Sequence, residues 1–129
     1  MPLKILLIED DADDIDLLEE AFRENKISYD LDVIMQGDQV TPYLSNVDSL
    51  PQVIVLDFNL PKLHGREVLS LIKTSPKIKE VPVVVLTTST AREDMEFALN
   101  NGAVHFITKP TSIQEFRNAV SLITKSATE

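Results

Sequence analysis

The chain has 129 residues, of which 43% are hydrophobic and 26% charged, as expected for one globular domain with its own apolar core. It contains no cysteine, which excludes disulfide frameworks, thiol catalysis and thiolate zinc sites. The net charge of −9 comes from 12 basic and 21 acidic side chains and disfavours direct binding to nucleic acid or to an anionic membrane surface.

The chain opens with MPLKILLIED, a short apolar run that contains one lysine and ends in acids. Such a run is too short for a secretory signal or a membrane span. We therefore expect a cytoplasmic protein with no membrane insertion.

Five short apolar runs recur along the chain. They cover residues 3–8, 31–35, 53–56, 83–86 and 104–107. Their apolar residues are continuous and rich in β-branched types, which is typical of parallel strands covered on both faces. These runs are the predicted strands.

The stretches between the runs have helical spacing. The expected inward faces are Ile15, Leu18 and Phe22 in the first stretch, Val68, Leu69 and Ile72 in the third, Met95, Ala98, Leu99 and Gly102 in the fourth, and Ile113, Phe116, Val120 and Ile123 in the fifth. The second helix is expected over residues 38–46. By this spacing, Phe97 falls off the inward face of the fourth helix, and Leu122 falls off that of the fifth.

Local signals support these helices. Thr90 with Glu93, and Ser112 with Glu115, match the capping-box pattern, and Gly102 suits a left-handed helix end. Strands that alternate with helices predict an α/β fold with a parallel sheet and right-handed crossovers. Residues 1–129 are expected to form a single domain, with no linker and no output domain.

Polar side chains follow four of the predicted strands. They are Glu9, Asp10 and Asp11 after the first strand, Asp57 after the third, Thr87 and Thr88 after the fourth, and Thr108 and Lys109 after the fifth. Because the carboxyl ends of parallel strands meet at one edge of the sheet, this edge is the expected ligand site.

The residue types at this edge suit phosphoryl chemistry. Asp10 and Asp57, with Glu9 acting through water, can hold Mg²⁺, and without a cation at least one of these carboxylates would tend to be protonated. An ionised Asp57 can attack phosphorus to give an acyl phosphate. The ammonium of Lys109 and the hydroxyl of Thr87 can then bind the phosphoryl oxygens.

Each of these residues also has a plainer interpretation. Asp11 suits an N-cap of the first helix, and a single aspartate or lysine beyond a strand is most often a turn residue or a solvated charge. We assign Thr88 a structural role. His64 and His105 lack the spacing of paired zinc ligands.

Four motifs in order, ILLIEDD, VIVLDFNLP with Gly65, VPVVVLTTS and HFITKP, resemble the receiver domains of two-component response regulators. The resemblance implies a flavodoxin-like, doubly wound, five-stranded sheet of order 2-1-3-4-5 with five helices. It makes Asp57 the phosphoacceptor, Glu9 and Asp10 the acid pair, and the Asn59 carbonyl a further metal contact. It also implies that Thr87 and Phe106 switch together, that Lys109 binds phosphate, and that the bond before Pro110 is cis.

The segments NLPKLHGREVL and VVVLTTS are similar to single-domain regulators that partner bacterial phytochromes. The short segment 46–52 departs from that group, and Thr88 departs from the small residue of most receivers.

The resemblance implies a stand-alone regulator that takes a phosphoryl group from a sensor histidine kinase or a histidine phosphotransfer protein and contacts a downstream protein target. Its cofactor would be Mg²⁺, with Mn²⁺ as a possible substitute. Because it is its own substrate, it is not expected to be a turnover enzyme. The fourth helix, fifth strand and fifth helix are the implied signalling and homodimer face, which makes Phe97, Phe106 and Leu122 the expected contact residues.

Two alternatives stay open. One is a receiver-like protein-interaction module that is never phosphorylated. The other is an aspartyl-phosphate phosphohydrolase resembling the haloacid dehalogenases, which require an acid/base aspartate two positions after the nucleophile. Asn59 occupies that position and cannot serve as the acid/base.

Overall fold

The computed structural model describes residues 2–60 and 63–128. The elements are β1 (Leu3–Ile8), α1 (Ala12–Glu24), β2 (Tyr29–Ile34), the short 3₁₀ helix η1 (Gly37–Gln39), α2 (Val40–Asn46), β3 (Val53–Leu56), α3 (Gly65–Thr74), β4 (Val83–Thr87), α4 (Arg92–Asn100), β5 (His105–Thr108) and α5 (Ile113–Thr128). No helix within the described ranges is long and apolar enough to span a membrane.

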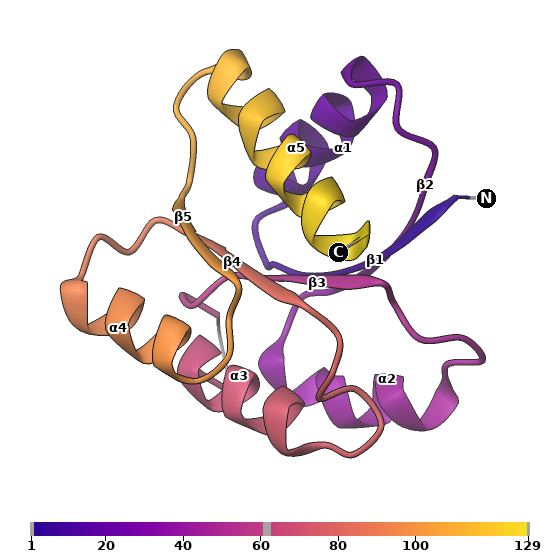
Figure 1. Cartoon of the computed structure of the whole chain (residues 1–129), viewed down its shortest axis with the longest axis vertical. Coiled ribbons are helices and arrows are strands. Elements are labelled where there is room, and N and C mark those ends of the chain that lie inside the picture. Colours follow the sequence, from indigo (N-terminus) through magenta and orange to yellow (C-terminus); the bar gives the residue numbers. More distant parts are fainter. Residues whose placement is uncertain (1, 61–62, 129) are drawn as a thin grey trace.

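The strands form one parallel sheet in the order β2-β1-β3-β4-β5, as predicted. Figure 1 shows α1 and α5 on one face of this sheet and α2, α3 and α4 on the other. The flavodoxin-like fold is therefore confirmed.

The strand bounds differ from the prediction mainly at β2, which begins at Tyr29 rather than Leu31. All of β1 pairs with β2 in parallel, from Leu3 opposite Tyr29 to Ile8 opposite Ile34. The strand β2 contains Asp30 and Asp32. It tolerates them because it lies at the edge of the sheet, where one side has no neighbouring strand.

The apolar core lies in two layers, one on each face of the sheet. Leu18 and Phe22 of α1 and Val120 of α5 fill one layer. The α3 residues Val68 and Leu69 help to fill the other. The predicted inward faces of α1 and α3 are broadly confirmed, but Ile113 was assigned wrongly. It is 62% exposed because it is the first residue of α5, where the chain has not yet reached the sheet.

The helix α4 turns a different face to the core from the predicted one. Phe97 packs against the core, whereas Met95 and Leu99 are 40% and 47% exposed. Ala98 is buried as predicted. The expectation of an exposed Phe97 is therefore wrong, and its physical reason is a rotation of the helix that places the ring beneath the Arg66 guanidinium, 5.2 Å from the ring centroid.

The predicted helix caps are confirmed in part. Ser112 caps α5 by accepting from the Glu115 N–H at 3.2 Å, and Gly102 has the left-handed φ of +100° expected after α4. The Thr90 capping box is wrong. The residue at the N-cap of α4 is Ala91, whose N–H bonds to the Ser89 hydroxyl at 3.2 Å, so the loop before the helix replaces the box.

Candidate functional site

Three carboxylates meet at the carboxyl edge of the sheet. Glu9 and Asp57 follow the adjacent strands β1 and β3, and each is only 3% exposed, while Asp10 is exposed. The Asp57 N–H bonds to the Ile8 carbonyl at 3.0 Å, which carries the strand pairing into the site. One oxygen from each carboxylate lies within 4.8 Å of the others, so the predicted cluster is formed.

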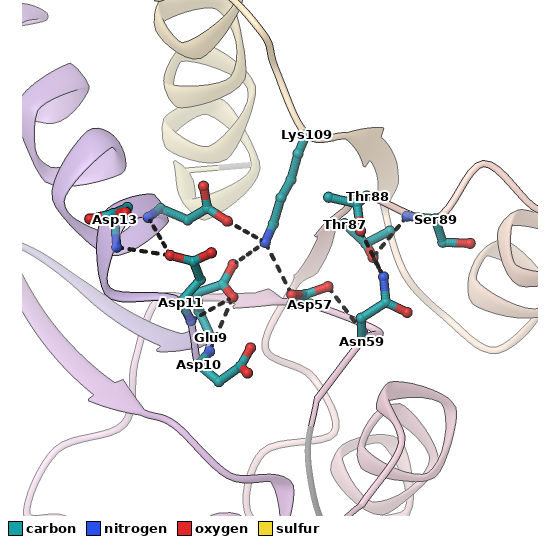
Figure 2. A network of polar contacts seen from close by, with 11 residues as sticks. Glu9, Asp10, Asp11, Asp13, Asp57, Asn59, Thr87, Thr88, Ser89 and Lys109 are labelled. Atoms are coloured by element: carbon teal, nitrogen blue, oxygen red, sulfur yellow. Dashed lines mark hydrogen bonds and ion pairs between the residues drawn. The ribbon is translucent and has the colours of Figure 1, made fainter.

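Lys109 reaches this cluster from the end of β5. Its ammonium lies 2.7 Å from Glu9 Oε1, 2.7 Å from Asp14 Oδ2 and 3.1 Å from Asp57 Oδ2 (Figure 2). Its backbone N–H donates to the Thr87 carbonyl at 2.7 Å, which fixes the start of the side chain. Asp14 was missed as a member of the site. It lies one helical turn after Asp10 and Asp11, and that spacing was the available signal.

The pKa values of Glu9 and Lys109 are both raised, for different reasons. Burial and the nearby charge of Asp57 raise the pKa of Glu9 to about 7, although the hydrogen bond from Lys109 opposes the change. Burial alone would lower the pKa of Lys109, but the bonds to Asp14 and Glu9 and the charge of Asp57 raise it above its usual value. The expectation that one carboxylate holds a proton readily without a cation agrees with the raised pKa of Glu9.

The donor set fits a hard divalent cation. The cluster offers only carboxylate oxygens, which are the ligands that such cations prefer. Glu9 Oε2 accepts from the Asp10 and Asp11 N–H groups, and Asp57 Oδ1 accepts from the Asn59 N–H at 3.0 Å. These bonds orient the carboxylates, so a cation would meet ligands that are already in place.

A second polar group, which centres on Thr87, adjoins Asp57. The Thr87 hydroxyl is fully buried and accepts from the Ser89 N–H at 3.3 Å and from the Asn59 amide at 3.4 Å. The same Asn59 amide donates to the Thr88 hydroxyl at 2.8 Å. Thr88 therefore takes part in the polar network of the site (Figure 2).

The expected switch aromatic, Phe106, lies half-buried on β5. Its ring makes an edge contact with Phe58, the residue after Asp57, with centroids 6.0 Å apart. Phe106 also lines an open groove with Met95 and Thr108. Leu122, another expected contact residue, is 37% exposed, whereas Phe97 is packed inward as described above.

The bond before Pro110 is trans. No peptide bond in the described ranges is cis, so the expected cis bond is wrong. The trans form is the more stable isomer of most X-Pro bonds. Lys109 reaches its carboxylate partners with the trans bond in place.

The histidines play no part in the carboxylate cluster. His64 caps α3, since its Nδ1 accepts from the Arg66 N–H at 3.0 Å, and His105 lies half-buried in β5. Among the described residues, the one group of His, Cys, Asp and Glu side chains arranged to hold a metal is Glu9, Asp10 and Asp57.

Residues 5–121 match the family model of the response regulator receiver domain. The chain belongs to that family. It is 36% identical over 126 residues to the probable methanogenesis regulatory protein FilR2 of Methanothrix harundinacea, an alignment that covers 95% of this receiver and 81% of FilR2. It is 34% identical over 119 residues to the response regulator Rcp1 of Synechocystis, with 88% of this receiver and 81% of Rcp1 covered.

Solved structures agree with this assignment. The phosphorylated cyanobacterial phytochrome response regulator RcpA matches the receiver with a TM-score of 0.86 at 34% identity, over 97% of this chain and 93% of RcpA. The Mn²⁺-bound form of Rcp1 matches with a TM-score of 0.84 at 33% identity, over 96% and 93% of the two chains. The receiver assignment made from the four motifs is confirmed.

Proposed function

We propose that this receiver is a stand-alone, phosphorylation-dependent signalling switch whose acceptor is Asp57. The observation that carries the proposal is the environment of this carboxylate. Asp57 is buried, bonds to the Lys109 ammonium, and shares a candidate cation site with Glu9 and Asp10. This arrangement supports the proposal, because a carboxylate that can act as nucleophile, an ammonium that can bind phosphoryl oxygens and a candidate cation site share one edge of the sheet.

The donor would be the phosphohistidine of a sensor histidine kinase or a histidine phosphotransfer protein. A carboxylate oxygen of Asp57 forms the new bond to phosphorus as the bond from phosphorus to the histidine nitrogen breaks, and the released imidazole takes up a proton. The Asn59 N–H holds Asp57 Oδ1, which orients the carboxylate for attack. Lys109 turns from the carboxylates to the transferred phosphoryl oxygens.

Mg²⁺, or Mn²⁺ as a substitute, would neutralise the charge on the phosphoryl oxygens during transfer. Glu9, Asp10 and Asp57 would hold the ion, and the main-chain carbonyl of Asn59 is proposed as a further ligand. The Mn²⁺-bound structure of the relative Rcp1 supports a divalent cation for the family.

The acyl phosphate would alter the surface through Thr87 and Phe106. Thr87 lies at the end of β4, and its hydroxyl would donate to a phosphoryl oxygen. The movement of Thr87 would free space that the Phe106 ring can fill from the neighbouring strand. The phosphoryl group would shift the population of the two states only as far as it binds one of them better.

The output would be a protein contact in the cytoplasm, through the face formed by α4, β5 and α5, with a downstream target or a second copy of this receiver. The protein would be its own substrate and not a turnover enzyme. The likeness to RcpA makes a bacterial phytochrome the first kinase to test.

Incubation with acetyl phosphate and Mg²⁺, followed by intact-mass measurement, tests the proposal. We expect a gain of one phosphoryl group that is lost in Asp57→Asn and in a metal-free control. If no phosphoryl group is gained from acetyl phosphate or from several histidine kinases, even with fast sampling, the result would favour the interaction module that is never phosphorylated. Repeated turnover of a general phosphate ester would instead favour the phosphohydrolase.

A further inference from the structure

Arg66, Asp94 and Ser89 form a clamp between three elements, which we call the Arg66–Asp94–Ser89 clamp. Arg66 lies in the first turn of α3, and its Nε and Nη2 atoms are 2.8 Å and 2.6 Å from Asp94 Oδ1. The Ser89 hydroxyl, in the loop before α4, donates to Asp94 Oδ2 at 2.6 Å. Both oxygens of the α4 carboxylate are therefore bound, each to a different element.

The carboxylate at the centre of the clamp is largely buried, whereas Arg66 is partly exposed. The Asp94 side chain is 13% exposed, and a hydrogen bond from Ser89, together with the bond and charge of Arg66, lowers the pKa of its carboxyl although burial opposes this. The Arg66 guanidinium also covers the Phe97 ring, which lies three residues after Asp94 on the same face of α4. Arg66 thus holds α4 at two points and keeps Phe97 turned inward.

The clamp connects with the phosphorylation site at both ends. Through Ser89 it reaches the switch residue, because the Ser89 N–H donates to the Thr87 hydroxyl at 3.3 Å. Through α3 it reaches the acceptor loop, because the Gly65 N–H donates to the Phe58 carbonyl at 3.1 Å. The contacts therefore form a route from Asp57 to Thr87 that passes through α3 and α4.

We infer that Asp94 is a positioning residue that holds the Thr87 hydroxyl in its resting place and α4 in its resting orientation. This inference rests on the proposed function, and it deepens it by naming what the phosphoryl group has to displace. Asp94 touches neither the acceptor nor the metal cluster and acts only through Ser89 and Arg66.

The direction of the effect follows from the hydrogen bonds. A Thr87 hydroxyl drawn toward a phosphoryl oxygen leaves the Ser89 N–H without its acceptor unless the loop moves with it. The loop is held by the bond from the Ser89 hydroxyl to Asp94, and Asp94 is held by Arg66. Weakening the clamp therefore favours the phosphorylated conformation, and the clamp sets the threshold of the switch.

The test uses beryllofluoride with Mg²⁺, a non-covalent probe of the phosphoryl site, titrated by calorimetry into the whole chain. We expect Asp94→Asn to bind the probe at least about fivefold more tightly than the parent, at the low end of allosteric couplings. Affinity for Mg²⁺ alone should not change, because the clamp lies apart from the carboxylate cluster. A general loosening of the site would instead weaken both.

Two further variants separate the clamp from helix stability. Ser89→Ala removes the link to the loop but keeps the Arg66–Asp94 pair, and it should also tighten probe binding. Arg92→Gln is the matched control, since it removes the exposed pair with Glu96 on the same helix and should change nothing. Thermal unfolding of each variant verifies that it folds.

The outcomes are distinct. If the parent binds the probe and Asp94→Asn and Ser89→Ala bind it equally or more weakly, the clamp inference is wrong and the proposed function stands. If the parent binds Mg²⁺ but not the probe and gains no phosphoryl group from acetyl phosphate, the proposed function fails and the inference falls with it.

Discussion

The Nζ atom of Lys109 lies 2.7 Å from Oε1 of Glu9, and this contact joins the end of β5 to the end of β1. Two other strands lie between them in the sheet. The two side chains are 10% and 4% exposed, so the pair is buried where water cannot stabilise either charge. The Lys109 ammonium thus forms ion pairs with three carboxylates, those of Glu9, Asp14 and Asp57.

Replacement of Lys109 by methionine should leave these carboxylates without their cation. We expect the free energy of unfolding, measured by urea titration in EDTA, to fall by about 3 kcal/mol. Saturating Mg²⁺ should restore part of the loss, and Mg²⁺ should bind more tightly than to the parent because the competing positive charge is gone. Phosphoryl acceptance should nevertheless decrease.

The surface pair of Arg117 with Glu24 provides the control. Arg117→Met should change the unfolding free energy by less than about 1 kcal/mol, since exposed pairs contribute little. An equal effect of the two substitutions would contradict the special role of Lys109.

The raised pKa of Glu9 makes stability depend on pH in a defined direction. The pKa of Glu9 is about 7 in the folded protein against an ordinary value of 4.5 in the unfolded chain, so the folded state binds more protons between these two pH values. Stability from this group is fully present below pH 4.5 and is lost as the pH rises through about 7. In EDTA, thermal unfolding should therefore shift to lower temperature over this window.

Glu9→Gln tests the assignment, because glutamine resembles the protonated acid and does not titrate. The variant should have a flatter dependence of melting temperature on pH between 5 and 7.5 than the parent. A parent-like slope in the variant would mean that another group is responsible.

Gly65→Ala should destabilise the receiver although alanine is normally the better helix former. A Cβ atom at Gly65 would lie 2.3 Å from the Phe58 Cα and 2.9 Å from the Asp57 carbonyl oxygen, so the acceptor loop itself would have to move. We expect a loss of about 3 kcal/mol in urea unfolding and a lower rate of phosphorylation by acetyl phosphate.

Gly102→Ala offers a comparison at a glycine that is required for its backbone conformation and not for close packing. Its φ of +100° strains an alanine, but the added Cβ would meet the flexible Lys73 side chain at 3.2 Å. A loss of about 1 kcal/mol with a normal phosphorylation rate is expected. If Gly65→Ala were stabilising, the close packing of α3 on the acceptor loop would be wrong.

The rotation of α4 gives opposite predictions for two neighbouring positions. Leu99→Asp should keep the melting temperature of the parent and abolish any self-association through α4, because Leu99 is 47% exposed. Phe97→Asp should lower the melting temperature, since it removes a ring that packs on the core and under Arg66. Analytical ultracentrifugation of the phosphorylated proteins measures association.

An unchanged dimer in Leu99→Asp would exclude this face of α4 as the contact. The reverse pattern, a stable Phe97→Asp and an unstable Leu99→Asp, would restore the helix orientation expected from spacing alone.

The strands were predictable because burial on both faces leaves a strong apolar pattern in the chain, whereas their order was implied by the resemblance to receiver domains. The four residues of β3 are all buried, and an apolar run bounded by polar residues predicts such a strand. The face of α4 was not predictable in the same way. Spacing favours Met95 and Leu99 as core residues, but the Arg66 guanidinium stabilises Phe97 inward, and that contact joins helices distant in sequence.

The residues of the candidate site also divide into those that the sequence predicts and those that depend on tertiary packing. Glu9, Asp57 and Lys109 each follow a predicted strand, so the rule for parallel sheets brings them to one edge. Asp14 lies within a helix, and its bond to Lys109 depends on how α1 packs against the sheet. The role of the clamp residue Asp94 could likewise not be predicted from the sequence, since its partners come from α3 and from the loop before α4.

The complete burial of β3 separates the receiver into parts that open on different timescales. Its amides should exchange with solvent deuterium only when the whole protein unfolds, because both neighbours and both helix layers protect them. The amides of Ser89 and Asn59 lie outside this protection and should exchange by local opening. A change at Asp57 would then spread sideways through loops and helix ends, while the strand beneath it keeps its place, so exchange rates should change around the strand and not within it.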